Sequence, residues 1–103
     1  MNTPNKLRSK IKELIIEKYG YACCTGCLKH IKTDSSHLCK KIHLTDVSKY
    51  QTIENLTEHC NQCHIKWESD QYKIMSTLKD FEENMQRIKQ LNELRYNRLI
   101  NKF

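Results

Sequence analysis

Apolar residues recur with a helical period near the N-terminus of the chain. The spacing of three or four residues predicts an amphipathic helix over residues 4–19. Pro4 suits the first turn of such a helix, and Gly20 suits a left-handed cap at its C-terminal end. The apolar positions on this face are Leu7, Ile11, Leu14 and Ile15.

The C-terminal third carries the most regular apolar pattern. It has no glycine or proline after Lys66, so the pattern predicts one helix of roughly 30 residues within residues 69–103, about 45 Å long at 1.5 Å per residue. A small core leaves part of such a helix uncovered unless the helix folds back on the N-terminal helix. The alternative is pairing with a second copy as a coiled coil, which predicts a homodimer. The stripe begins at Ile74, Leu78, Phe81, Met85 and Ile88.

The middle of the chain shows no sustained helical period between residues 33 and 50. Its short apolar stretches predict two brief strands joined by the lysine-rich loop at residues 40–43. A helical pattern returns at Asn55 and continues to Trp67, which we expect to lie in the core. His30 and His59 stand alone, and we expect both to be exposed to solvent. This mixture of elements predicts an α+β fold.

Composition limits how this fold can be stabilised. A chain of 103 residues with 38% hydrophobic and 29% charged residues forms one domain with a lean core, so a metal, disulfides or a partner subunit must supplement it. No apolar run reaches the roughly 18 residues that span a bilayer, and the N-terminal segment does not resemble a signal peptide. We therefore expect no membrane association and a reducing, cytoplasmic location. There the six cysteines are more readily metal ligands than disulfides.

Four of the cysteines form two pairs with metal-ligand spacing. The pairs are Cys24-x-x-Cys27 and Cys60-x-x-Cys63, with 32 residues between them. Two such pairs complete the tetrahedral four-thiolate site of a zinc ion, and a site without an open position is structural. Cys23 offers a second spacing to Cys27, although the match between the two pairs favours Cys24. Cys39 has no partner at ligand spacing and is predicted to be a core thiol.

A further pattern lies within this cysteine frame. It consists of Ser36-His37, then Ile53-Glu54-Asn55-Leu56, then His64 directly after the last cysteine. The order CxxC, xH, IENL, CxxCH resembles the zinc-supported HNH nucleases over about residues 13–67. The resemblance implies a ββα-metal, treble-clef-like zinc core over residues 20–68, between the N-terminal helix and the long C-terminal helix, in a single domain of residues 1–103. Looser similarities to phage recombination nucleases imply a virus-encoded protein that acts in the host cell.

The resemblance also implies a role for each residue. His37 matches the general base, Asn55 the asparagine that orients it, and His64 a ligand of a catalytic magnesium or other divalent ion. Histidine titrates near neutral pH and can take a proton from water, while the cation neutralises charge on the phosphate. In many HNH nucleases an acidic residue or a histidine precedes the base and binds the ion, whereas here that residue is a serine. The further candidate ligands are Asp34, Ser36 and His43.

The net charge is compatible with a polyanionic partner. The chain has 18 basic and 12 acidic residues, a net charge of +6, which suits DNA and equally suits a solubilising surface. Lysine binds phosphate as a point charge and does not read bases as arginine does. We therefore expect a metal-dependent HNH endonuclease that cleaves DNA with low sequence specificity. The alternatives are a catalytically inactive, zinc-stabilised nucleic-acid-binding module and an adaptor that binds proteins through the C-terminal helix. The lysines expected to contact DNA are Lys29, Lys32, Lys40, Lys41 and Lys49.

Overall fold

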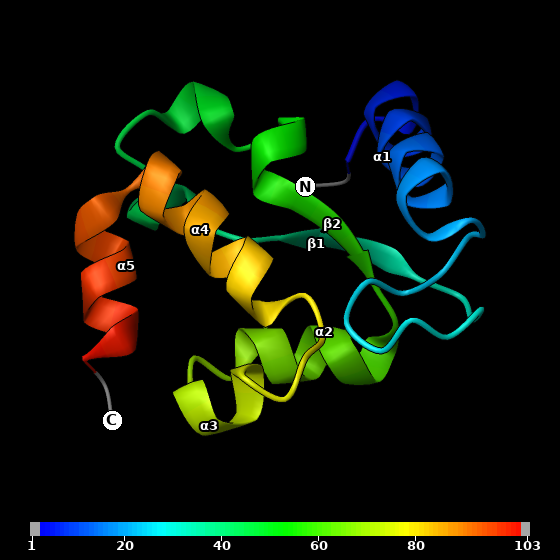
Figure 1. The fold of residues 1–103 in the computed structure, drawn as a ribbon. Coiled ribbons are helices and arrows are strands. Elements are labelled where there is room, and N and C mark those ends of the chain that lie inside the picture. The colour runs from blue at the N-terminus through cyan, green and yellow to red at the C-terminus, as the bar shows by residue number, and fades with distance from the viewer. Residues whose placement is uncertain (1–2, 102–103) are drawn as a thin grey trace.

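A short antiparallel hairpin lies between helices that come from both ends of the chain (Figure 1). The computed structural model describes residues 3–101. Its helices are α1 (Asn5–Tyr19), α2 (Asn61–Glu68), α3 (Tyr72–Met75), α4 (Phe81–Leu91) and α5 (Glu93–Ile100). Its strands are β1 (Asp34–His37) and β2 (Leu56–His59), joined by a loop with the 3-10 turns η1 (Lys41–His43), η2 (Val47–Lys49) and η3 (Ile53–Asn55). The predicted α+β class is confirmed.

Helix α1 agrees with the helix that the N-terminal pattern predicts. Gly20 has a φ of 86°, and its N–H bonds to the carbonyl of Ile16, so the helix ends in the expected left-handed cap. Ile11 and Ile15 are buried in a cluster with Leu56 of β2. The apolar face of α1 therefore covers the sheet.

An ion pair fastens α1 to β2. The guanidinium of Arg8 donates to Oε1 of Glu58 at 3.1 Å, although the Glu58 side chain is only 1% exposed. The hydroxyls of Thr33 and Ser35 donate to the same carboxylate at 2.8 and 3.0 Å. A buried charge is tolerated when it is paired and hydrogen-bonded in this way.

The second strand lies later in the chain than the sequence pattern predicts. Residues 40–50 form turns and no strand, while β2 occupies a segment that was expected to be helical, and α2 begins only at Asn61. In the sheet, Asp34 pairs with His59 and His37 pairs with Leu56. All four residues of β2 are buried, and both α1 and α2 contact the strand. Burial by these distant neighbours outweighs the local helical pattern.

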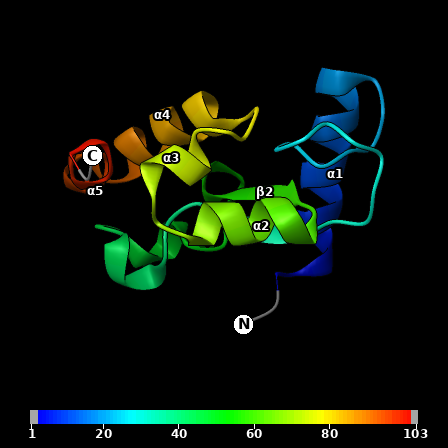
Figure 2. The ribbon, with the colours of Figure 1, turned by 90° about the horizontal axis from the view of Figure 1, so that it is seen from below.

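The prediction of one long C-terminal helix is wrong. The chain instead forms α3, α4 and α5, which change direction and cover the core (Figures 1 and 2). Asp70 takes a left-handed φ of 59° before α3. Asn92 leaves helical geometry at a φ of −161°, and its side chain accepts the N–H of Arg95 to cap α5. Polar caps of this kind interrupt a helix without disturbing the apolar period. The buried positions of the stripe are Leu78, Phe81, Met85, Ile88 and Leu99.

The predicted homodimer depended on an apolar stripe left uncovered by its own chain, and this packing covers most of that stripe. Most of the stripe lies in the core of its own chain, together with three of the metal-ligand cysteines, while Ile74 and Leu94 remain exposed. The homodimer stays a prediction without that support. Within residues 3–101, no helix is both long enough and apolar enough to cross a bilayer.

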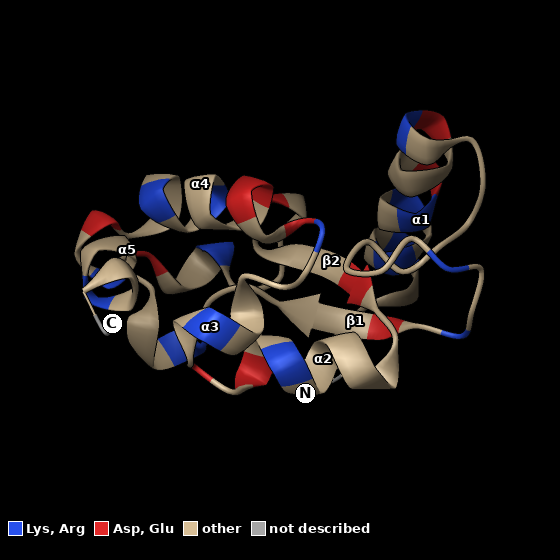
Figure 3. Ribbon diagram, turned by 60° about the horizontal axis from the view of Figure 1, so that its bottom comes forward, with Lys and Arg blue, Asp and Glu red and all other residues tan. Residues whose placement is uncertain are grey.

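Basic residues are distributed around the molecule. Figure 3 shows lysine and arginine on α1, on the loop before β1, and on α3, α4 and α5. The five predicted DNA contacts are all exposed, and they fall into two groups at opposite ends of β1. Lys29 and Lys32 precede the strand, whereas the other three follow it, and a strand of four residues spans about 13 Å. The two groups are therefore separated by the length of the strand.

Candidate functional site

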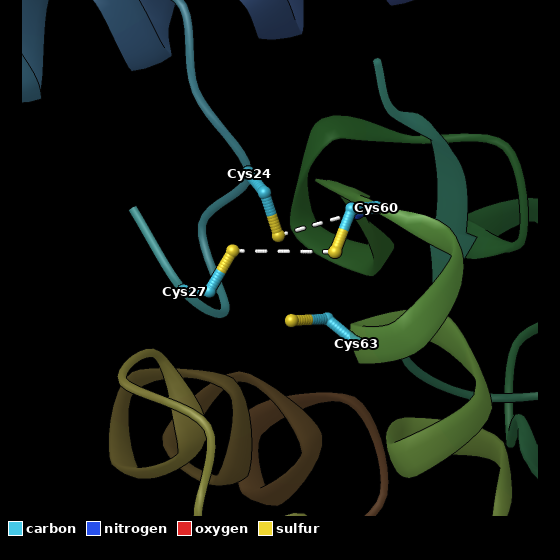
Figure 4. A group of neighbouring side chains, drawn as sticks. All are labelled: Cys24, Cys27, Cys60 and Cys63. Carbon is cyan, nitrogen blue, oxygen red and sulfur yellow. Dashed lines mark hydrogen bonds between the residues drawn. The ribbon is translucent and has the colours of Figure 1, made fainter. Parts of the chain in front are cut away.

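Four cysteine side chains converge where the loop after α1 meets the start of α2 (Figure 4). Their sulfur atoms lie within 4.8 Å of one another, and the sulfur atoms of Cys27 and Cys60 are 4.0 Å apart. Tetrahedral zinc with Zn–S bonds of about 2.3 Å holds its sulfur ligands about 3.8 Å apart. The quartet Cys24, Cys27, Cys60 and Cys63 therefore fits a metal ion such as zinc, in agreement with the predicted pairing.

The backbone around the quartet explains the glycine between the first two cysteines. A Cβ atom on Gly26 would lie 3.0 Å from both Cβ and Sγ of Cys63, so a larger residue here would require the Cys63 ligand to shift. The turn closes through a hydrogen bond from the N–H of Leu28, which has a φ of 63°, to the carbonyl of Cys24. The Sγ of Cys24 also accepts the N–H of Cys60 at 3.2 Å. The two pairs are thus positioned by backbone contacts as well as by the side chains.

Protonation of the quartet is coupled to metal binding. Burial raises the pKa of the Cys24 and Cys63 thiols, so both are neutral at pH 7 when no cation is near. A divalent ion reverses this preference, because a coordinating thiol loses its proton. Metal binding therefore releases protons, and the affinity for the metal falls as the pH falls.

The remaining two cysteines lie outside the quartet. Cys23 is buried under α1 with Ile11 and Ile15, which settles the ambiguity of spacing in favour of Cys24. Cys39 lies in the main core at 1% exposure, and burial raises its pKa to about 11. The prediction of a core thiol at Cys39 is confirmed, as is the core position of Trp67.

A buried polar network lies next to the quartet. His59 was expected to be exposed, but it is fully buried, and its Nε2 lies 2.8 Å from Oδ2 of Asp80. The hydroxyl of Thr25, the residue after Cys24, donates to the same oxygen at 2.6 Å. Burial alone would raise the pKa of Asp80, yet the hydrogen bond and charge of His59 together with the Thr25 hydroxyl hold it below its ordinary value. The network joins the cysteine loop, β2 and the start of α4, and no motif in the sequence points to it.

His37 ends β1 with its ring against a tyrosine. The rings of His37 and Tyr50 are stacked, with centroids 4.1 Å apart and an angle of 5° between their planes. Nε2 of His37 lies 2.8 Å from Oε1 of Gln51, so the tautomer with its proton on Nε2 satisfies this contact and places the lone pair on Nδ1. Burial lowers the pKa of His37 despite the Gln51 hydrogen bond. The imidazole is therefore neutral at pH 7, and sequence reasoning missed both of its neighbours.

Asn55 bridges the loop between the strands. Its Oδ1 accepts the N–H of Cys39 at 2.7 Å. Its Nδ2 donates to the carbonyls of Cys39 and Tyr50 at 3.1 and 3.0 Å. Because Tyr50 stacks on His37, these bonds fix the surface on which the histidine ring rests. They agree with the orienting role that the resemblance implies, while the catalytic role of Asn55 stays a prediction.

Ser36 and His64 meet between β1 and α2. Oγ of Ser36 lies 3.1 Å from Nδ1 of His64, and Ser36 is fully buried. The fold therefore brings together two of the residues predicted to hold a catalytic ion. A neutral hydroxyl and one imidazole are fewer ligands than a divalent ion usually takes from a protein.

The other two candidate ligands lie elsewhere. The Asp34 side chain is largely exposed and lies 3.9 Å from the guanidinium of Arg8. His43 lies in η1, where its carbonyl accepts the side-chain amide of Asn92. Within residues 3–101, the cysteine quartet is the only group of three or more His, Cys, Asp or Glu residues whose ligand atoms converge. Asp34 and His43 therefore do not complete a second cluster with His64.

Comparison with known proteins assigns no family to the chain. No protein-family model matches it, and neither the curated proteins nor the solved structures give a match. Any functional conclusion therefore rests on the residues and geometry described above.

Proposed function

We propose that this chain is an HNH-type endonuclease that hydrolyses DNA phosphodiester bonds with the help of a divalent ion. One arrangement carries the proposal: His37 ends β1, Asn55 directly precedes β2, and His64 lies on α2 within 3.1 Å of β1 residue Ser36. The cysteine quartet holds the beginning of α2 against the loop after α1, and its member Cys60 directly follows β2, so the quartet lies at the junction between the hairpin and the helix. A strand–strand–helix unit with a base on one strand and a metal ligand on the helix suits attack on a phosphodiester.

The proposed chemistry begins with the free Nδ1 atom of His37. A water molecule that attacks phosphorus must lose a proton, and a neutral imidazole takes it. The Gln51 hydrogen bond keeps the other ring nitrogen protonated, and the stack on Tyr50 fixes the ring plane. Asn55 holds the carbonyl of Tyr50. The base is thus oriented before any substrate binds, which is how positioning contributes to catalysis.

A divalent ion would neutralise the charge that gathers on the phosphate and on the departing 3′-oxygen. His64 would hold this ion, with the hydroxyl of Ser36 next to it. Imidazole suits zinc, nickel or copper, whereas magnesium prefers carboxylates and water. The donor set therefore favours a transition-metal ion over magnesium.

Plasmid cleavage tests the proposal. Supercoiled DNA is incubated with zinc-loaded protein and magnesium, manganese, cobalt or nickel, and nicked product is measured on a gel. We expect nicking, fastest with a transition-metal ion. A folded, zinc-loaded protein that cleaves with none of these ions would contradict the endonuclease proposal.

The second candidate is a nucleic-acid-binding module that has kept the scaffold without the chemistry. It is favoured by Ser36, whose neutral hydroxyl stands beside His64 where a carboxylate would bind an ion more tightly. Ser36→Asp separates the candidates, with Ser36→Ala as the control that adds no ligand. If the chain is an endonuclease, we expect the wild-type protein to cleave the plasmid. Ser36→Asp should then reach its half-maximal cleavage rate at a roughly tenfold lower ion concentration. For the binding module, wild type and Ser36→Ala shift the plasmid on a gel and do not cleave it.

A further inference from the structure

Ile42 is the most exposed large hydrophobic residue within residues 3–101, with 85% of its surface open to solvent. It lies in η1, in the loop that joins β1 to β2, next to Lys41. Single apolar residues on a surface are common and need no explanation. Ile42 differs from the other exposed apolar residues because hydrogen bonds hold its turn in place and because this turn lies beside His37.

The turn that carries Ile42 is held from both sides. The N–H of His43 bonds to the carbonyl of Lys40 at 2.9 Å, and the side chain of Asn92 donates to the carbonyl of His43 at 2.6 Å. Leu44 is buried in the main core. Ile42 is therefore carried by an anchored turn, and a backbone that is already held in place loses little conformational freedom when it binds a partner.

The same turn borders the candidate base. Nζ of Lys41 lies 5.1 Å from the centroid of the Tyr50 ring, which stacks on His37. His37, Lys40 and His43 also line one small cleft. A phosphate bound at His37 would thus lie close to Lys40 and Lys41, the two residues that precede Ile42.

The charge of the loop selects the partner. Residues 40–49 contain three lysines and one aspartate, Asp46, whose carboxylate accepts the N–H and the hydroxyl of Ser48. An apolar tip that directly follows two lysines suits a polymer with anionic edges and an apolar interior, which describes stacked DNA. Proteins that kink DNA insert apolar side chains between base steps in this way.

We propose that Ile42 is a wedge that enters the base stack of DNA bound at His37, while Lys40 and Lys41 contact the flanking phosphates. The inference rests on the proposed DNA-cleaving function and names its substrate class. Separating two stacked bases is unfavourable, and it is least so where a base is mismatched or unpaired. The preferred substrate is therefore DNA with a weakened base step.

Binding to two duplexes of equal length tests the wedge. One duplex is fully paired, the other has a single mismatch, and both carry 2-aminopurine at the central step. The duplexes are titrated with zinc-loaded protein without added catalytic ion. Fluorescence anisotropy of the DNA gives the Kd values, and 2-aminopurine emission reports unstacking of the central step. We expect wild type to bind the mismatched duplex roughly tenfold more tightly, with a rise in emission. Ile42→Ala should lose both effects, and Ile16→Ala, an isoleucine 47% exposed on α1, should retain both.

The possible outcomes separate the wedge from the function on which it rests. An Ile42→Ala protein with unchanged preference and emission overturns the wedge. Equal wild-type affinity for the two duplexes also overturns it and leaves DNA binding intact, whereas no binding to either duplex contradicts the proposed function as well. A lower mass of Ile42→Ala than of wild type in sedimentation would show that Ile42 faces a second copy, which again overturns the wedge.

Discussion

The cysteine side and the histidine side of the β1–β2 hairpin differ in burial and in the origin of their partners. On the cysteine side, Cys24, His59 and Asp80 are at most 4% exposed, and the contacts join segments from three parts of the chain. On the histidine side, His37 and His64 are half-buried, and their partners Gln51 and Ser36 are neutral. The first region is largely shielded from solvent, with only Cys27 half-buried among the four ligands, whereas a ligand can reach both histidine rings of the second.

This difference separates stability from chemistry. Charged and metal-ligating groups that are fully buried stabilise the fold only while every partner is present, so the loss of one partner is severe. Half-buried neutral groups retain lone pairs for a substrate and contribute less to the core. Changes on the cysteine side should therefore unfold the protein, while changes on the histidine side should leave it folded and alter its reaction.

The largest effect is expected from Cys63→Ser, which removes one ligand of the quartet. Structural zinc sites contribute on the order of 10 kcal/mol to folding, more than a lean core supplies alone. We expect the variant to lose its zinc in elemental analysis and its cooperative thermal transition in circular dichroism. Cys23→Ala is the matched control, because Cys23 is equally buried next to the quartet without belonging to it. A Cys63→Ser protein that melts like wild type with one zinc per chain would refute the structural role.

On the histidine side, His37→Ala should lower the cleavage rate by roughly 10² to 10⁴ without unfolding the protein. The reason is that the ring supplies the base and makes few core contacts. Single-turnover cleavage and a thermal melt measure the two effects separately. His30→Ala, at an exposed histidine, should cleave like wild type. Wild-type rates in folded His37→Ala would place the base elsewhere, with His43 the next residue to test.

Local patterns predict the parts of the fold that local interactions decide. The two cysteine pairs converge as their spacing predicts, and Gly20 ends α1 where its conformational freedom is needed. The C-terminal stripe shows the limit of such patterns. An apolar period indicates which side of a helix is buried, but it does not reveal that Asn92 ends one helix and caps the next. Nor does it reveal whether a second copy or the chain's own core covers the stripe.

Sequence patterns do not predict the contacts between segments that are distant along the chain. His59 was expected to be exposed because its buried partner, Asp80, lies 21 residues away and stands in no recognisable motif. Gln51 and Tyr50 contact His37 from a loop that Asn55 closes through hydrogen bonds to the carbonyls of Cys39 and Tyr50. The motif predicts His37 as a candidate site residue, and tertiary structure supplies the neighbours that orient its ring.

Asp80→Asn tests the cysteine side without touching a ligand. The amide keeps the shape of the carboxylate and removes the charge that faces buried His59, so we expect a loss of about 2 to 3 kcal/mol in urea unfolding. The lowered pKa of Asp80 means that the charged form stabilises the fold above the ordinary pKa of 3.8 and is lost only below it. The deficit should therefore be the same at pH 7 and pH 8. Asp46→Asn, in the exposed loop, should unfold like wild type.

The smallest effect concerns which end of β1 meets DNA. Each phosphate contact steepens the dependence of log Kd on log salt concentration by about 0.9. We expect Lys41→Ala to reduce this slope by about 0.9, the contribution of one phosphate contact, because Lys41 adjoins the Tyr50–His37 stack. Lys10→Ala, an exposed lysine on α1 that lies 3.9 Å from Glu13, should keep the wild-type slope. Titrations of one duplex at several salt concentrations give both values. If Lys32→Ala lowers the slope and Lys41→Ala does not, DNA binds at the cysteine end of the strand. That result would contradict a reactive site on the histidine side.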